Sequence, residues 1–452
     1  MIVTFLCLLL YISNNIYFVK GVKMMFSKWS ANEPYYLFFN KLASCAETIE
    51  HINAVFFKEL LCPSMGQVKC SLHITNTVDV RWLMSMYALM NIAMTPVTLI
   101  YGTLDKPNDF DTIKYQYPML TYARVATGPY SKHNSKMSIF KYHDNSVRIV
   151  IYTADLTDDD WSKCNNGLWI SPACPPVSED TGVEKGKNTY FKPNLIYYLD
   201  SYRMDIISPW VETIRIVDFS SIKVFLITSI PGEHQKGRDN HLNVVANLLK
   251  KHCVMPKGID REENKWKIIG VSPSIGDLGK YFSHWLKLFV TSLSHHKRYK
   301  EDSPHNRFNF IYPSDKNIKQ GCRMQCTTRY TREQHDEQIW FQRSMRPWKA
   351  NLLRRTKVMP HIKCYTRISP CLKKSVYLLL TSADLGPEGW GLNVGDRQVM
   401  VRNYELGILF IPRFFDEEMF EIEIPTNNRK VFPIIFDLPL RRYQTGEEPW
   451  LS

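Results

Sequence analysis

Residues 376–385 have the sequence VYLLLTSADL, a run of strand-forming apolar residues that ends in a short polar turn. Residues 148–156, RIVIYTADL, repeat this pattern, and the Asp residues of the two runs are 229 positions apart. Each Asp is followed six residues later by a Trp, Trp161 in the first copy and Trp390 in the second. A pattern that recurs at such a distance indicates a duplicated lobe. We expect both Trp residues to be core anchors.

A second element is duplicated upstream of each run. Residues 132–137 and 359–364 are basic and contain a His, and their Lys136 and Lys363 lie 227 positions apart. Around these elements, strand-like runs alternate with longer helical stretches. The expected strands cover 97–101, 147–152, 224–228 and 376–381, and the expected helices cover 240–252 and 278–293. This alternation predicts an α/β protein in which each lobe has a mixed sheet covered by helices on both faces.

The domain division follows from the same pattern. Pro231-Gly232 ends a strand and precedes a polar, turn-prone stretch, so we place the boundary there. The first lobe then covers residues 31–231 and the second 232–452, each of a suitable size for one core. Residues 1–30 form an apolar extension. Its run 2–12 is too short to span a membrane, and it is either a secretory signal or an ordinary extension.

Composition limits the classes of function. The chain has 452 residues, of which 44% are hydrophobic and 22% charged, so disorder is excluded. The net charge of +13 favours a polyanionic partner. No HExxH, Walker A or GxGxxG motif occurs, and the eleven Cys contain no CxxC pair. We therefore expect neither a metal site nor a cofactor, and we expect the reduced thiols of an intracellular protein.

One segment concentrates the positive charge. Residues 316–363 contain twelve Lys or Arg against three Asp or Glu, interleaved with Tyr330, Trp340, Phe341 and Trp348. Basic residues between aromatic ones suit phosphate contacts and base stacking, which predicts a groove for single-stranded nucleic acid. The alternative is a solvated surface region.

His361 and Lys363 form the most informative pair. Two residues apart on an extended segment, they point to the same face and can address one ligand together. An imidazole can transfer a proton near neutral pH or attack phosphorus, and an ammonium neutralises a phosphate oxygen. The pair therefore fits phosphodiester chemistry.

Several motifs resemble the tyrosyl-DNA phosphodiesterase family of the phospholipase D superfamily. In the second half these are Met359–Lys363, Thr381–Ala383 and Tyr404–Pro412, and in the first half Lys136-Met137, Asp160-Trp161 and Gly167–Pro172. The connecting elements Ser274–Gly279 and Ile311–Ser314 also match. The likeness runs from about Asn32 to Trp450.

The resemblance implies two pseudo-symmetric phospholipase D-like lobes and hydrolysis, without metal, of the bond between a 3′ DNA phosphate and a tyrosine or other adduct. It implies that His361 is the general acid and base, and that Lys363 and Lys136 hold the phosphate. Glu405 takes the position of a Glu that helps to orient the second His, and Tyr130 that of an aromatic residue that stacks on DNA. Ser274 lies in a matching connecting element and is expected to contact substrate.

Three positions depart from the family pattern. The place of the nucleophilic His holds Asn134, which cannot form a phosphohistidine. His133 could replace it only through a β-bulge that re-aims the side chain. The spacing from Lys136 to Asp155, one residue longer than in the family, favours such an irregularity. The two family Asn positions, expected to contact substrate, hold Asp155 and Asp384. Carboxylates there repel a phosphate unless they are protonated or paired with Lys.

We therefore expect a monomeric, nuclear DNA-repair phosphodiesterase that acts on a single-stranded or frayed 3′ end and needs neither metal nor membrane. One alternative is a weakened or inactive relative that binds single-stranded nucleic acid. The other is a secreted phospholipase D-like nuclease, suggested by the apolar N-terminus alone.

Overall fold

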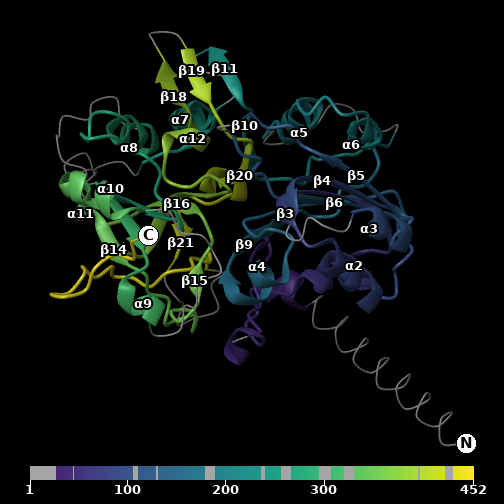
Figure 1. Ribbon diagram of the computed structural model, residues 1–452, viewed down its shortest axis with the longest axis horizontal. Helices are drawn as coiled ribbons and strands as arrows, with labels where there is room; N and C mark the ends of the chain where they lie inside the picture. Colours follow the sequence, from purple (N-terminus) through teal and green to yellow (C-terminus); the bar gives the residue numbers. More distant parts are fainter. Residues whose placement is uncertain are drawn as a thin grey trace, which may run out of the picture.

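The computed structural model describes residues 27–43, 45–104, 110–128, 131–178, 189–235, 240–255, 266–294, 307–319, 330–394, 398–422 and 431–451. Predictions on residues 1–26, on Tyr130 and on the basic stretch 320–329 lie outside this part of the chain. Figure 1 shows two lobes side by side, one drawn mainly from purple to teal and the other mainly from teal-green to yellow.

The first lobe is built on a mixed sheet. In the described residues its strands follow the order β2-β1-β9-β7-β6-β3-β4-β5. Their bounds are β1 Leu37–Asn40, β2 Ala54–Val55, β3 Val68–Val78, β4 Val97–Leu104, β5 Leu120–Arg124, β6 Met137–Tyr142, β7 Val147–Tyr152 and β9 Gly167–Ile170. All six residues of the central strand β7 are buried, as expected for an apolar run covered on both faces.

The second lobe repeats this design. Its sheet has the order β10-β20-β17-β16-β12-β13-β14, with β21 paired to β17. The bounds are β10 Phe225–Ser229, β12 Lys267–Val271, β13 Phe308–Tyr312, β14 Met345–Pro347, β16 Cys364–Ile368, β17 Lys374–Thr381, β20 Glu405–Phe410 and β21 Phe420–Glu421. Smaller pairings join β11 Gly232–Gln235, β19 Gln398–Val401 and β18 Leu392–Val394, and β8 Cys164–Asn165 with β15 Met359–Pro360.

Helices surround the two sheets (Figure 1). They are α2 Val80–Leu89, α3 Phe110–Gln116, α4 Asp158–Lys163, α5 Phe191–Asp200, α6 Ser208–Arg215, α7 His241–His252, α8 Leu286–Ser294, α9 Asp315–Lys319, α10 Arg332–Glu337, α11 Ile339–Gln342 and α12 Pro387–Trp390. The 3-10 helices are η1 Ala46–Thr48, η2 Phe57–Leu61, η3 Pro63–Met65, η5 Asp205–Ile207 and η8 Pro412–Phe415. Side-chain caps start several helices, for example Asn240, whose Oδ1 accepts from Asn243 N at the start of α7.

The two faces of the first sheet belong to two separate cores. Residues of α5 and α6 pack with one face, whereas α2 and η2 pack with the other. The core that contains α5 and α6 continues into the second lobe, where it takes in β17, β20, α7 and α8. The first lobe therefore confirms the expected layering, and the two lobes share one continuous core.

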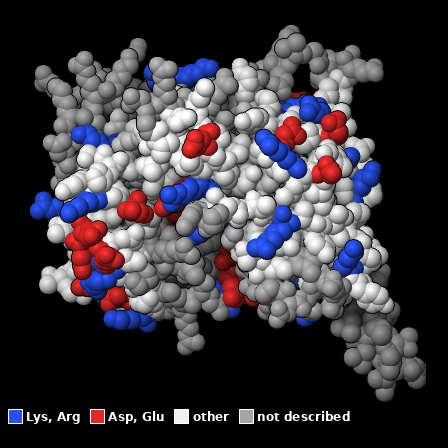
Figure 2. Space-filling model, turned by 45° about the horizontal axis from the view of Figure 1, so that its top comes forward, with Lys and Arg blue, Asp and Glu red and all other residues white. Residues whose placement is uncertain are grey.

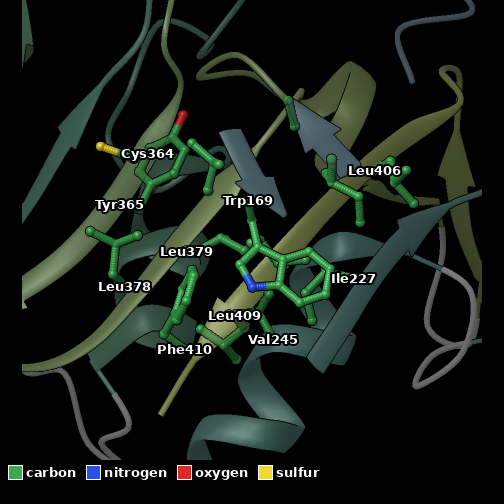
Figure 3. Packing of buried hydrophobic residues seen from close by; sticks show 14 of the residues in the cluster. Trp169, Ile227, Val245, Cys364, Tyr365, Leu378, Leu379, Leu406, Leu409 and Phe410 are labelled. Atoms are coloured by element: carbon green, nitrogen blue, oxygen red, sulfur yellow. The ribbon is translucent and has the colours of Figure 1, made fainter. Parts of the chain in front are cut away.

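The lobes pack closely through β9. A Cβ on Gly167 would lie only 2.6 Å from Ile362 Cδ1 and 2.9 Å from Leu380 Cδ1, so the glycine permits the close approach. Trp169 belongs to the same cluster as Leu379, Leu409 and Phe410 of the second sheet, as Figure 3 shows. Buried Arg355 adds a polar link, because it donates to Asn165 Oδ1 and Asn40 O across the lobes.

The division between the sheets lies earlier in the chain than the expected boundary. β10 precedes Pro231-Gly232, yet it pairs antiparallel with β20 and so belongs to the second sheet. The expected helix 278–293 also begins late, at Leu286. Trp161 and Trp390 are 4% and 0% exposed, which confirms their structural role.

Two further observations concern the expected class of protein. Among the described helices, none has the length and apolar character needed to cross a bilayer. Cys164 is disulfide-bonded, so the expectation that every thiol is reduced is wrong at this position.

Candidate active site

The duplicated positions, 134 and 136 in the first half and 361 and 363 in the second, lie where the backbones of the two lobes contact each other. In the first half, Asn134 N donates to Tyr404 O at 2.9 Å. In the second half, His361 N donates to Asn165 O at 2.8 Å. Each segment thus pairs with the other lobe, and the two contacts are equivalent across a pseudo-twofold axis.

This equivalence identifies the residue that faces His361 across the axis. Lys136 Nζ donates to Asn134 O and Lys363 Nζ donates to His361 O, both at 3.2 Å. Because both backbone contacts and both lysines match, Asn134 is the structural counterpart of His361. That this position is the family's nucleophile position stays a prediction from the resemblance.

His361 is held by residues of the first lobe. Its Nδ1 lies 3.0 Å from Asn166 Oδ1 and 3.4 Å from Asp160 Oδ2. Since an amide oxygen only accepts hydrogen bonds, Nδ1 carries the proton and Nε2 keeps its lone pair. Burial, with Lys363 and Lys136 nearby, holds the pKa of His361 well below its usual range. The imidazole is therefore neutral at neutral pH.

The elements that supply Asp160 and Asn166 are fixed locally. Thr157 caps α4 by accepting from Asp160 N at 3.3 Å, which sets the first turn that carries Asp160. Asn166 Oδ1 also accepts from Thr153 Oγ1 at 2.8 Å, and Asn166 Nδ2 donates to Asp160 O at 2.7 Å. Burial raises the pKa of Asp160. Sequence reasoning missed Asn166, although the family-like segment at 167–172 follows it directly.

Glu405 does not orient His361, contrary to the expectation from the family. Asn134 Nδ2 lies 3.1 Å and 3.3 Å from the two Glu405 carboxylate oxygens. Ser382 Oγ and Asn403 Nδ2 also donate to this carboxylate. The reason is the crossed arrangement of the halves, in which a residue of each lobe holds the catalytic position of the other. Burial raises the pKa of Glu405.

Asn134 is fully engaged. Its Nδ2 also donates to Ser382 O at 2.8 Å, and its Oδ1 accepts from Lys136 Nζ at 2.8 Å. The amide therefore lies at the position that matches the His361 imidazole, uses the Glu405 carboxylate as acceptor, and engages Lys136, one of the two lysines that the resemblance predicts to hold phosphate.

His133 is not re-aimed toward the site. It is 2% exposed, its Nδ1 lies 2.9 Å from Thr75 O, and its Nε2 lies 2.9 Å from Tyr202 Oη. Burial lowers its pKa to about 3. The suggestion that a bulge turns His133 into the nucleophile is wrong, because successive residues of an extended segment point to opposite sides. His133 thus points into the core behind Asn134.

The two Asp residues stand beside the two lysines. Asp155 Oδ1 accepts from Thr75 Oγ1 at 3.0 Å and Thr77 N at 2.9 Å, and lies 3.6 Å from Lys136 Nζ. Asp384 is close enough to Lys363 for its charge to act on that ammonium, although burial has the larger effect and lowers the pKa of Lys363. One carboxylate oxygen of Asp384, Oδ1, is buried without a hydrogen-bond partner.

Ser274 lies next to this second Asp. Its neighbour Ile275 forms a bridge with Leu385, the residue after Asp384. Ser272 Oγ donates to Ser274 O at 2.6 Å, just as Thr75 Oγ1 donates to Thr77 O at 2.9 Å in the first half. The expected site residues His361, Lys363, Lys136, Asn134, Glu405, Asp155, Asp384 and Ser274 thus lie around the junction of the lobes.

The expected stacking groove is not formed by the aromatic residues of 316–363. Tyr330, Phe341 and Trp348 are all 0% exposed, and Trp340 donates from Nε1 to Lys280 O. The rings of Tyr330, Phe341 and Trp348 belong to the core and cannot stack on bases, whereas Trp340 is only partly buried against it. Among the described residues on the face seen in Figure 2, Lys and Arg are interspersed with Asp and Glu and form no continuous basic stripe.

Comparison with known proteins agrees with this geometry. The family model described as tyrosyl-DNA phosphodiesterase matches residues 36–444. Tyrosyl-DNA phosphodiesterase 1 of Drosophila melanogaster is 31% identical over 454 residues, covering 94% of this chain and 75% of that protein. A probable tyrosyl-DNA phosphodiesterase of Caenorhabditis elegans is 28% identical, covering 84% and 81%.

A solved structure shows the same fold. The crystal structure of the yeast tyrosyl-DNA phosphodiesterase superposes with a TM-score of 0.69 at 18% identity, covering 92% of this chain and 99% of that one. The two lobes are therefore phospholipase D-like. With a family model that spans most of its length, the chain belongs to the tyrosyl-DNA phosphodiesterase family.

Proposed function

We propose that this chain binds the phosphodiester of a blocked 3′ DNA end, as its family does, and that its turnover through a phosphohistidine on the first half is largely lost. The main support for this proposal is the position of Asn134, which is the counterpart of His361 across the pseudo-twofold axis. An amide has no nucleophilic lone pair on nitrogen, so a covalent N–P bond cannot form there.

Binding is supported by the parts of the site that remain. Lys136 and Lys363 are 1% and 2% exposed, and each is held by the backbone of the residue two positions earlier. Buried ammonium groups in a water-poor site attract phosphate oxygens strongly. The substrate class is a DNA strand with a 3′ adduct, single-stranded or frayed at the end, bound by a monomer.

A second candidate is slow hydrolysis with His361 as nucleophile. It is favoured by the hydrogen bond from Nδ1 to Asn166 Oδ1, which leaves Nε2 free. Nε2 would attack phosphorus as the bond to the tyrosine oxygen breaks, and that oxygen would take a proton from water. A second water would then attack phosphorus and break the N–P bond, losing its proton to the hydroxide left by the first water. This step releases a 3′-phosphate and restores the imidazole.

The test uses a 5′-labelled oligonucleotide with a 3′-phosphotyrosine, in EDTA, with wild-type protein, Asn134→His and His361→Ala. Binding is measured by fluorescence anisotropy and cleavage on a gel. The proposal expects wild type to bind tightly, with little cleavage. Rapid cleavage by wild type would overturn it. A phosphate trapped on His361, found by mass spectrometry, would establish the second candidate.

Nuclear localisation and a part in DNA repair follow from this substrate class. Imaging of the tagged full chain tests the location, and secretion into the medium would contradict it.

A further inference from the structure

The second lobe carries a cationic hollow far from the active site. Four basic residues line it, and we call them the basic cluster: Lys267, Arg343, Arg346 and Arg442. Ile368, at the end of β16, also lines the hollow, whereas Lys363 precedes the start of this strand. Five residues of a strand span about 17 Å, so the cluster lies at the opposite end of the strand from the active site.

The sheet register brings the basic cluster together. Ile269 pairs with Asn309, and Ile311 pairs with Arg346. Because alternate residues of a strand share a face, Lys267, two positions before Ile269, lies on the same face as Arg346. The C-terminal segment then crosses this region, where Tyr443 Oη donates to Tyr312 O and so places Arg442 beside β14.

The hollow has two adjoining parts. One, of about 290 Å³, includes Lys267, Asn309 and Arg346, and the other, of about 390 Å³, includes Arg343, Arg346 and Arg442. Arg346 belongs to both parts, and it is 7% exposed. In addition, Asn309 Oδ1 is buried without a hydrogen-bond partner. Together the two parts are large enough to admit more than one phosphate group.

Among the residues that the structure describes, no acidic side chain balances the basic cluster. Within the described chain, none of its four members forms an ion pair, and no carboxylate lines either part of the hollow. Asp437 and Glu447 are the nearest carboxylates along the C-terminal segment, and both have other partners. Asp437 accepts from Asn351 N and Leu352 N, and Glu447 accepts from the two terminal guanidinium nitrogens of Arg441, at 2.5 Å and 2.8 Å. Burial lowers the pKa of Lys267 and of Arg346, and the charge of Arg442 lowers both further. Positive charges gathered without anions favour an external anion.

We propose that the basic cluster binds backbone phosphates of nucleic acid, as a second contact that does not require a 3′ end. Guanidinium groups bind phosphate oxygens in a bidentate manner, and three of the four members are arginines. An exposed rim, Arg343 and Arg442, and a buried base, Arg346, suit a strand that passes over the hollow and sets a phosphate into it.

The test uses a covalently closed, internally labelled circle of single-stranded DNA. A circle has no 3′ end, so its binding is independent of the function proposed for the active site. The test variant is Arg343→Gln with Arg442→Gln. The matched control is Lys250→Gln with Lys251→Gln, which removes two exposed charges from α7 of the same lobe.

Each phosphate contact to a single strand contributes about 0.7 to the slope of log K against log salt. Two contacts therefore raise the binding constant about 25-fold at 0.1 M salt relative to 1 M salt. We expect the test variant to lose about this factor in affinity and about 1.4 in slope, and the control to change less than about threefold. Arg343→Lys with Arg442→Lys, which keeps the charges, is expected to retain most of the affinity. Equal losses in test and control variants, or no loss in either, would overturn the proposal.

Discussion

Asn134→His should restore a nucleophile to the first half of the site. Asn and His share Cβ and Cγ, so an imidazole Nδ1 at this position would take the place of the amide nitrogen that lies 3.1 Å and 3.3 Å from Glu405. Nε2 would then project one atom further, as it does in His361. The change also frees Lys136, which now donates to Asn134 Oδ1 at 2.8 Å.

Asn134→His should change both the stability of the protein and its cleavage rate. Loss of the bond from Lys136 removes a hydrogen bond to a charged group, so the free energy of unfolding should fall by about 1.5–3 kcal/mol. Loss of one member of a catalytic unit commonly costs several orders of magnitude, because the rest of the site cannot replace it. We expect at least about a 10³-fold gain in the single-turnover rate, which corresponds to about 4 kcal/mol of barrier.

The assay is single-turnover cleavage of the 3′-phosphotyrosyl oligonucleotide, with trapping of the phosphohistidine at position 134. Asn134→Gln is the matched control, because it keeps an amide and supplies no imidazole. Adding His361→Ala to Asn134→His should remove the gain. If Asn134→His is folded and binds the oligonucleotide but cleaves no faster than wild type, the missing nucleophile is not what limits this chain.

Three further predictions concern charge, packing and pH. Asp155→Asn should raise the affinity for a 3′-phosphate oligonucleotide at least about tenfold by freeing Lys136 from a carboxylate 3.6 Å away, whereas the exposed control Asp158→Asn should leave it unchanged in a titration. His133→Ala should lower the free energy of unfolding by about 2–4 kcal/mol in urea, because Tyr202 Oη and Thr75 O lose their hydrogen-bond partner. Added to Asn134→His, it should leave cleavage measurable. Complete loss of that cleavage in a folded protein would assign His133 to the chemistry. His73, His133 and His241 have pKa values of about 3 because they are buried, so the unfolded state binds more protons between about pH 6.5 and 3, and stability should fall as the pH decreases through this range. At pH 5 each of these His residues should lower the free energy of unfolding by up to about 2 kcal/mol. The raised pKa values of Asp160 and Glu405 partly offset this loss of stability. An unchanged urea midpoint between pH 7 and 5 would contradict this expectation.

Much of the fold was predictable because it is encoded in contiguous runs. The expected strand 147–152 coincides with β7, and the expected strand 376–381 lies within β17. Both are apolar, strand-forming segments that end in polar turns, so their structure depends mainly on local composition. The helix expected over 278–293 begins only at Leu286, because an apolar run does not by itself specify where a helix starts.

The equivalence of the halves could also be predicted, because it needs only spacing. Lys136 and Lys363 were paired by their distance from the two apolar runs, and the structure gives them matching contacts. The same spacing placed Asn134 opposite His361. These inferences required no knowledge of how the lobes dock.

What only the tertiary structure decided is which side chains meet between the lobes. Glu405 holds Asn134, and Asn166 holds His361, across separations of 271 and 195 residues. The direction of His133, the burial of Trp348 and the gathering of the basic cluster likewise depend on packing between distant segments. Sequence determined the two lobes and the residue types at their junction, since local pattern and spacing are properties of the chain. The partners of those residues were decided by the crossed docking of the lobes, which no local pattern records.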